Sequence, residues 1–95
     1  MHRDKGDLDS ALADYNNAIR LKRDLARAFN NRSIARRMKG DLDGALTDCN
    51  EAIRLKLDDA GAFYNRSIVR KSKGYPAAAQ RDYNEAIRLG YKPTT

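Results

Sequence analysis

The sequence predicts an all-α fold, an α-solenoid built from antiparallel helix hairpins that repeat every 34 residues. Three observations support this prediction. Alanine occurs 14 times whereas β-branched residues number nine, a composition that favours helices over sheets. A Lys-Gly pair recurs at a fixed interval, which is typical of structural repeats. Apolar residues recur every three or four positions, the spacing that places them on one face of a helix.

The repeat is visible in the Lys-Gly pairs that begin at Lys5, Lys39 and Lys73, each 34 residues after the last. Residues 5–38 and 39–72 share 23 identities in 34 positions. A two-helix unit cannot bury its apolar face alone, so neighbouring units must stack. We therefore expect one array over residues 1–95, divided into a leading helix at 8–22, repeat units at 24–57 and 58–90, and a tail at 91–95.

The leading helix is expected at residues 8–22, where apolar residues follow the helical spacing. A second helix follows Asp24, a residue type favoured as an N-cap, and continues to about Met38. Gly40 then provides the left-handed residue that commonly ends a helix. We name helices of the second kind helix A and helices of the first kind helix B.

Both kinds of helix recur along the chain. A helix B is expected at 41–55, and the next helix A at 58–72, where Asp58 is the candidate cap. The last helix B is expected at 76–89, with Pro76 at the first helical position, where its missing N–H matters little. The order is therefore B-A-B-A-B, and the short connections make each helix antiparallel to the next.

The period and the residue pattern resemble those of tetratricopeptide repeats. That family has an aromatic residue, Leu-Gly and Tyr in its first helix, and Ala, an aromatic residue and Ala in its second. Phe29 and Phe63 fill the first aromatic slot, while Ala45, Cys49 and Ala52 fill the second-helix slots. The resemblance implies a non-enzymatic scaffold for protein–protein interaction, in which the A helices form a concave wall that holds a peptide segment of a partner.

Charged residues replace apolar ones at several slots of the family pattern. They recur with the repeat, as Arg32, Arg36, Arg66 and Arg70 on the A helices and Asp14, Asp48 and Asp82 on the B helices. Arginines one turn apart repel each other unless a carboxylate lies between them. We predict that Arg32 pairs with Asp14 or Asp48, and that Arg66 pairs with Asp48 or Asp82. The alternative is that these arginines only extend into solvent.

The candidate binding residues lie on the face of the A helices that points away from Phe29. They are Arg27, Asn30, Ile34, Arg37 and Met38, followed by Tyr64, Ile68 and Lys71. Two isoleucines flanked by basic groups suit a peptide that has an apolar anchor and acidic residues. Alternatively, the isoleucines pack between adjacent A helices. Asn31 and Asn65 are expected to cap or bridge neighbouring helices rather than grip a peptide carboxylate.

No pattern in the sequence points to catalysis, a cofactor or a metal. His2 has no cysteine or carboxylate cluster at metal-ligand spacing. Cys49, the single cysteine, lies on the apolar stripe of a helix B, which predicts a buried and inert thiol. No apolar run approaches the roughly 20 residues that a membrane-spanning helix needs. We therefore expect a cytoplasmic protein.

Two other functions stay open at this point. The formal net charge of +6 permits binding of RNA or another polyanion along the same face, with Tyr64 as a stacking group. Carboxylates are interleaved with the basic residues, however, which favours an ion-paired surface. The third possibility is a purely architectural module that joins copies or extends a larger chain. Both ends of the array leave a helix B uncapped, so we expect either a fragment of a longer array or self-association through the ends into a homo-oligomer.

Overall fold

The structure, a computed structural model, describes residues 5–93, so that His2 lies outside the described residues. Within this range the chain contains five α-helices and no strand, which confirms the predicted all-α solenoid. The helices are α1 (Lys5–Arg20), α2 (Leu25–Met38), α3 (Leu42–Leu55), α4 (Ala60–Ser72) and α5 (Pro76–Arg88).

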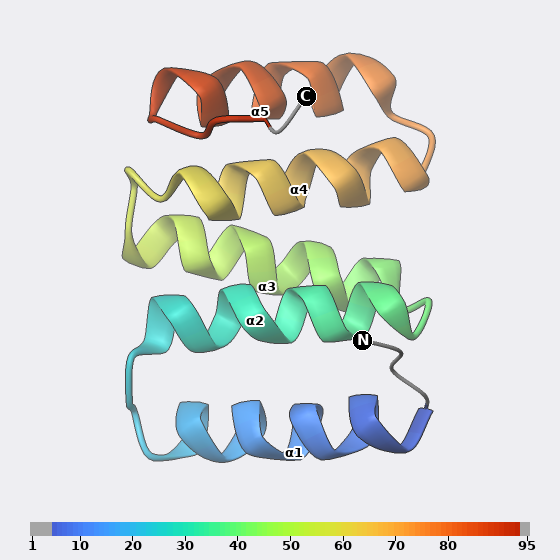
Figure 1. Ribbon diagram of the computed structural model, residues 1–95, viewed down its shortest axis with the longest axis vertical. Coiled ribbons are helices and arrows are strands. Elements are labelled where there is room, and N and C mark those ends of the chain that lie inside the picture. Colours follow the sequence, from blue (N-terminus) through green and yellow to red (C-terminus); the bar gives the residue numbers. More distant parts are fainter. Residues whose placement is uncertain (1–4, 94–95) are drawn as a thin grey trace.

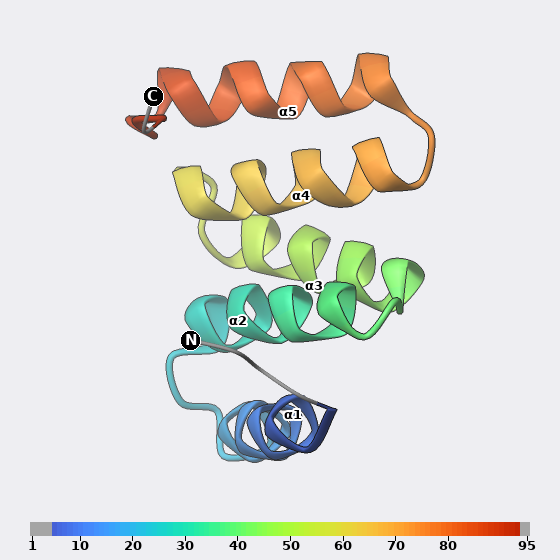
Figure 2. The same cartoon turned by 45° about the vertical axis from the view of Figure 1, so that its right-hand side comes forward.

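The helices stack one above another in chain order, from α1 at one end to α5 at the other (Figure 1). Each runs antiparallel to the next, and the turned view in Figure 2 keeps the same order. The A helices are α2 and α4, and the B helices are α1, α3 and α5. Helices α2 and α3 form one hairpin and α4 and α5 the next, while α4 also contacts both members of the hairpin before it.

Two of the expected caps differ from the structure. Asp24 precedes α2 but has φ 42 and makes no side-chain cap bond. An N-cap carboxylate reaches the helix from extended backbone. Asp24 is left-handed instead, and so is Lys22, at φ 56, in the same tight connection after α1. Asp59, not Asp58, caps α4 and accepts a bond from the Ala62 N–H at 3.2 Å. Asp58 stands one residue too early to do so.

The bounds of the leading helix also differ from the expected 8–22. Helix α1 begins at Lys5 and ends at Arg20, because the left-handed Lys22 breaks the helix before the apolar pattern ends. Asp41 does cap α3, accepting from the Gly44 N–H at 2.9 Å. Pro76 starts α5, as the sequence predicted.

Glycine ends each A helix. Gly40 has φ 88 and Gly74 has φ 92, a region that residues with a Cβ avoid. After each glycine the chain closes the helix end: the Asp41 N–H donates to the Arg36 carbonyl at 2.8 Å, and the Tyr75 N–H donates to the Arg70 carbonyl at 2.9 Å. Each hairpin therefore turns within a few residues and brings its two helices into direct contact.

The core is built mainly from small side chains. One cluster joins Ala45 and Cys49 of α3 to Val69 of α4, and a second joins Ala52 and Ile53 of α3 to Ala62 of α4, with Phe29 and Phe63 packed against it. Alanine lets the helix backbones approach closely, so the hairpins fit together without large apolar residues. Helix α4 is thereby seated on the hairpin formed by α2 and α3.

Candidate functional site

Paired charges hold the first hairpin together. The Arg32 guanidinium donates to both carboxylate oxygens of Asp48, from Nε at 2.9 Å and from Nη2 at 2.8 Å. Arg36 adds a contact to the same carboxylate at 3.2 Å, so the carboxylate separates the two like charges. Asp48 is fully buried, while Asp14 is exposed. Of the two predicted partners for Arg32, the structure therefore selects Asp48.

The second hairpin repeats this arrangement. Arg66 donates to Asp82 from Nε at 3.0 Å and from Nη2 at 2.8 Å, and Arg70 reaches Asp82 at 2.8 Å. Asp82 is thus the partner of Arg66, and Asp48 is not. The alternative in which these arginines only extend into solvent is wrong, because ion pairing removes all four from the freely available surface charge.

Each bidentate arginine makes two further contacts. The Arg32 guanidinium lies 5.3 Å from the centre of the Phe29 ring, and Arg66 lies 5.2 Å from that of Phe63. Each guanidinium also donates to a side-chain amide oxygen on the preceding helix B. Arg32 donates to Asn16 at 2.8 Å, and Arg66 donates to Asn50 at 3.0 Å. These contacts explain why arginine stands where the family pattern has an apolar residue: its charge is paired and its planar head stacks on the aromatic ring.

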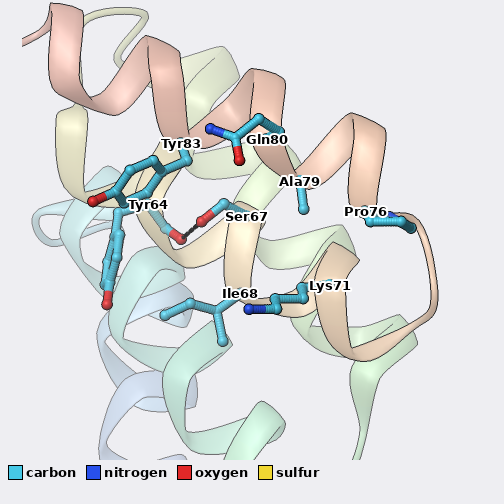
Figure 3. Close-up of a pocket in the computed structure, with 8 residues that line it drawn as sticks. All are labelled: Tyr64, Ser67, Ile68, Lys71, Pro76, Ala79, Gln80 and Tyr83. Atoms are coloured by element: carbon cyan, nitrogen blue, oxygen red, sulfur yellow. Dashed lines mark hydrogen bonds between the residues drawn. The ribbon is translucent and has the colours of Figure 1, made fainter.

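A cavity of about 390 Å³ lies between α4 and α5 (Figure 3). Its lining comprises Tyr64, Ser67, Ile68 and Lys71 from α4, and Pro76, Ala79, Gln80 and Tyr83 from α5. Three of these residues, Tyr64, Ile68 and Lys71, are predicted site residues. The helix B wall and Ser67 were missed by the sequence analysis, which assigned the binding face to the A helices alone.

The other five predicted site residues lie along α2 and do not line this cavity. Arg27 is exposed and Met38 is 47% exposed, while Ile34 and Arg37 are half-buried. Asn30 is turned toward the neighbouring A helix, where its side-chain oxygen accepts a hydrogen bond from Asn65. Asn65 therefore bridges neighbouring A helices, which is one of its two expected roles, and Asn30 is its partner.

Three tyrosines meet at one end of the cavity. Tyr91, which follows α5, stacks on Tyr64 with ring centres 4.2 Å apart, and Tyr83 contacts both at 6.3 Å and 6.2 Å. A hydrogen bond with Tyr64 is the main cause that raises the pKa of Tyr91 from 10.0 to about 12. Tyr91 was expected in a short tail, and its contacts could not be predicted because they depend on how the chain folds back after Gly90.

The cavity combines an apolar floor with polar groups at its edge. Ile68 is half-buried and Ala79 buried, while Gln80 and Lys71 are exposed. Lys71 forms no ion pair within residues 5–93, although Arg66 and Arg70 on its helix and Lys73 just after the helix do. An unpaired ammonium beside an apolar hollow favours a ligand with both an apolar and an acidic group.

Cys49 lies outside this cavity and is fully buried. Burial in apolar surroundings raises the pKa of its thiol, an effect that exceeds the opposing hydrogen bond to Ser33. The thiol is therefore held in its protonated, unreactive form.

Over residues 5–93, no group of three histidine, cysteine or acidic side chains could hold a metal ion. Across that same part of the chain, every helix is too short or too polar to span a bilayer.

A family model described as TPR repeat matches residues 1–36 of the chain. The internal repeat extends this match, because residues 39–72 share 23 of 34 positions with residues 5–38. The match over residues 1–36 supports the resemblance to tetratricopeptide repeats seen in the sequence. No individual curated protein matches the chain. Tetratricopeptide repeats are generally modules for protein–protein interaction and are typically non-enzymatic.

Proposed function

We propose that this tetratricopeptide array is a cytoplasmic scaffold that binds a peptide segment of a partner protein along the A-helix face. The cavity between α4 and α5 is the anchoring point, and it is the single observation that carries the proposal. Its size and mixed lining resemble those of sites that bury one side chain and orient it with a few polar groups. The partner segment continues from there toward Ile34 and Arg37 of α2.

The cavity residues have separate roles in this proposal. Ile68 and Ala79 contact an apolar anchor side chain, and Tyr83 closes one end. Lys71 pairs with an acidic residue next to the anchor, since no carboxylate of residues 5–93 forms an ion pair with it. Arg37, one repeat earlier at the equivalent position, offers a second basic group. The expected ligand is therefore a segment with an apolar residue flanked by acidic ones.

Selection from a random peptide library displayed on phage tests this proposal. Recovered peptides are expected to carry an apolar residue beside acidic residues, and their affinities can be measured by fluorescence anisotropy. The Ile68→Asp variant is expected to lose binding because it places a charge on the apolar floor, and Ile34→Asp should weaken only peptides that reach α2. Leu57→Asp is the matched control, since Leu57 is 75% exposed and does not line the cavity.

Circular dichroism must show that each variant keeps its helix content. The proposal fails if no peptide is enriched, or if the enriched peptides bind Ile68→Asp as tightly as the unmodified chain.

Binding of polyanions is the less supported alternative, because Arg32, Arg36, Arg66 and Arg70 are already paired with buried carboxylates. A random-sequence RNA oligonucleotide that binds at low salt and dissociates steeply as salt rises would favour it.

A further inference from the structure

The cavity between α4 and α5 has a filled counterpart one repeat earlier. Each lining residue corresponds to a residue 34 positions before it, and together these counterparts are Asn30, Ser33, Ile34, Arg37, Leu42, Ala45, Leu46 and Cys49. Ser33, Ala45 and Cys49 are 1%, 0% and 0% exposed, so the floor of this groove is covered, while Ile34 and Arg37 at its edge stay half-buried. The two grooves belong to equivalent hairpins but differ in what covers them, because within residues 5–93 the α4–α5 groove is covered only at one end, where Tyr91 stacks on Tyr64.

Helix α4 covers the earlier groove. Its Val69 packs against Ala45 and Cys49, with Leu42 at the edge of the same cluster. Asn65, one turn before Val69, bonds to Asn30 on the other wall of the groove. This chain therefore contains one example of what a hairpin groove of this type binds, and the occupant is an α-helix.

The geometry of the open groove is also that of a helix-binding site. The four α4 residues that line it, Tyr64, Ser67, Ile68 and Lys71, are spaced as i, i+3, i+4 and i+7. The four α5 residues, Pro76, Ala79, Gln80 and Tyr83, follow the same spacing. Each set forms a stripe along its helix, and the two stripes run side by side as the walls of one groove (Figure 3). An amphipathic helix fits between walls of this kind.

We propose that the α4–α5 groove binds an amphipathic helix of a partner protein that carries an acidic residue opposite Lys71. This inference rests on the proposed function and specifies the conformation and the charge of the partner segment. The bound helix lies parallel to α4, as α4 lies parallel to α2 (Figure 1).

The position of the acidic residue follows from the register of the filled groove. Asn30 of α2 contacts Asn65 of α4, an offset of 35 residues between parallel helices. The same offset places Ser72 of α4 opposite Arg37 of α2. In the open groove Lys71 takes the place of Arg37, so the residue of the partner helix that matches Ser72 faces the lysine ammonium. An acidic side chain at that position supplies the missing counter-charge.

A second copy of this chain cannot supply one of its A helices to the groove. The helix that fills such a groove presents an apolar stripe, which in α4 includes Ala62 and Val69. In α4 these residues are 0% and 1% exposed, and their counterparts in α2, Ala28 and Ala35, are 5% and 2% exposed. Both A helices thus already use this stripe within their own chain, and neither can be offered to a neighbour without unfolding.

The α4 sequence itself provides the probe. A synthetic peptide of residues 58–73 is held helical by a hydrocarbon link between positions 67 and 71. In α4 these positions face α5 rather than the preceding groove, so the link leaves the docking face free. The second probe carries Ser72→Glu, and the negative control carries Val69→Asp. Binding to the full chain is measured by fluorescence anisotropy and located by NMR shifts at Ala79 and Gln80.

The Glu probe is expected to bind about two- to fivefold more tightly than the Ser probe, the range of a partly exposed ion pair. Lys71→Ala in the protein should remove that advantage while leaving the Ser probe unaffected. The Val69→Asp peptide should not bind. Leu57→Asp should bind both probes normally. Equal binding of the Val69→Asp peptide, or shifts that avoid α5, overturns the inference.

Two further results separate this inference from the proposed function. If library-selected peptides bind in an Ile68-dependent manner while the helical probes do not, the peptide-binding function stands and the helical partner is wrong. If neither class binds, both fail. Light scattering that shows a dimer, dissociated by Tyr83→Asp, assigns the groove to self-association and also overturns the partner helix.

Discussion

Arg32 and Asp48 meet through two parallel hydrogen bonds, Nε to Oδ2 at 2.9 Å and Nη2 to Oδ1 at 2.8 Å, although they belong to different helices. The side chain of Asp48 is 1% exposed and that of Arg32 is 16% exposed. Such a pair is worth little beyond an apolar contact of equal size, but the loss of one member leaves the other charge uncompensated. The hairpin therefore depends on this pair remaining intact.

Asp48→Asn is expected to lower the free energy of unfolding by about 3–5 kcal/mol, because two arginines lose the carboxylate between them. The midpoint of urea denaturation, followed by circular dichroism, measures this change. Asp14→Asn is the matched control, since Asp14 occupies the equivalent position of α1 and is exposed. Equal midpoints for the two variants would show that the buried pair does not stabilise the hairpin.

Gly74→Ala is expected to destabilise the second hairpin by about 1–2 kcal/mol, because a Cβ is unfavourable in the left-handed region that Gly74 occupies at φ 92. The space around this residue is open, so the effect is one of backbone conformation and not of collision. Gly74→Asn should lose less, since asparagine tolerates this conformation better. Thermal denaturation of both variants measures the difference, and a larger loss for asparagine would contradict the explanation.

Cys49 is expected to react slowly with a thiol reagent in the folded protein and rapidly in urea. Burial raises its pKa above the ordinary value of 9.0, so the reactive thiolate is scarce in the native state. The folded protein holds this proton more tightly than the unfolded chain. The resulting stabilisation is complete below about pH 9 and is lost as the pH rises through the folded pKa. Native labelling as fast as that in urea would show that the thiol is accessible.

Tyr91 is expected to ionise at a pKa of about 12, and Tyr64→Phe should return this value toward 10.0. The hydrogen bond with Tyr64 favours the neutral phenol, and the phenylalanine variant removes it. Its contribution to stability is present below pH 10 and disappears as the pH rises through about 12. NMR titration of labelled tyrosine rings follows Tyr91 individually. An unchanged pKa in the variant would assign the shift to another cause.

The sequence was sufficient to predict the array, because a 34-residue period fixes helix order. The same period narrowed the partner of each arginine to two carboxylates, and the structure selects those 16 residues away, Asp48 for Arg32 and Asp82 for Arg66. Asp14 could be separated from Asp48 only by the structure, since both occupy equivalent positions. One is buried between helices and the other is exposed.

The cavity was only half predicted for a different reason. Helical periodicity shows which residues share a face, but not which faces of two helices form a common wall. Tyr64, Ile68 and Lys71 were identified as one stripe, whereas Gln80 and Tyr83 belong to a helix that was expected to lie outside the binding face. The predicted cap at Asp24 was wrong, because the left-handed backbone of this residue depends on the geometry of the preceding connection.

Because the carboxylates of Asp48 and Asp82 are each satisfied inside a single hairpin, adding or deleting a whole 34-residue unit leaves no buried charge orphaned. Duplication of one unit can therefore lengthen such an array in one step, and deletion of one unit can shorten it, without a compensating substitution at the new junction. The arginine–aspartate pair makes each hairpin an exchangeable building block, and the number of blocks becomes free to vary with the length of the surface required.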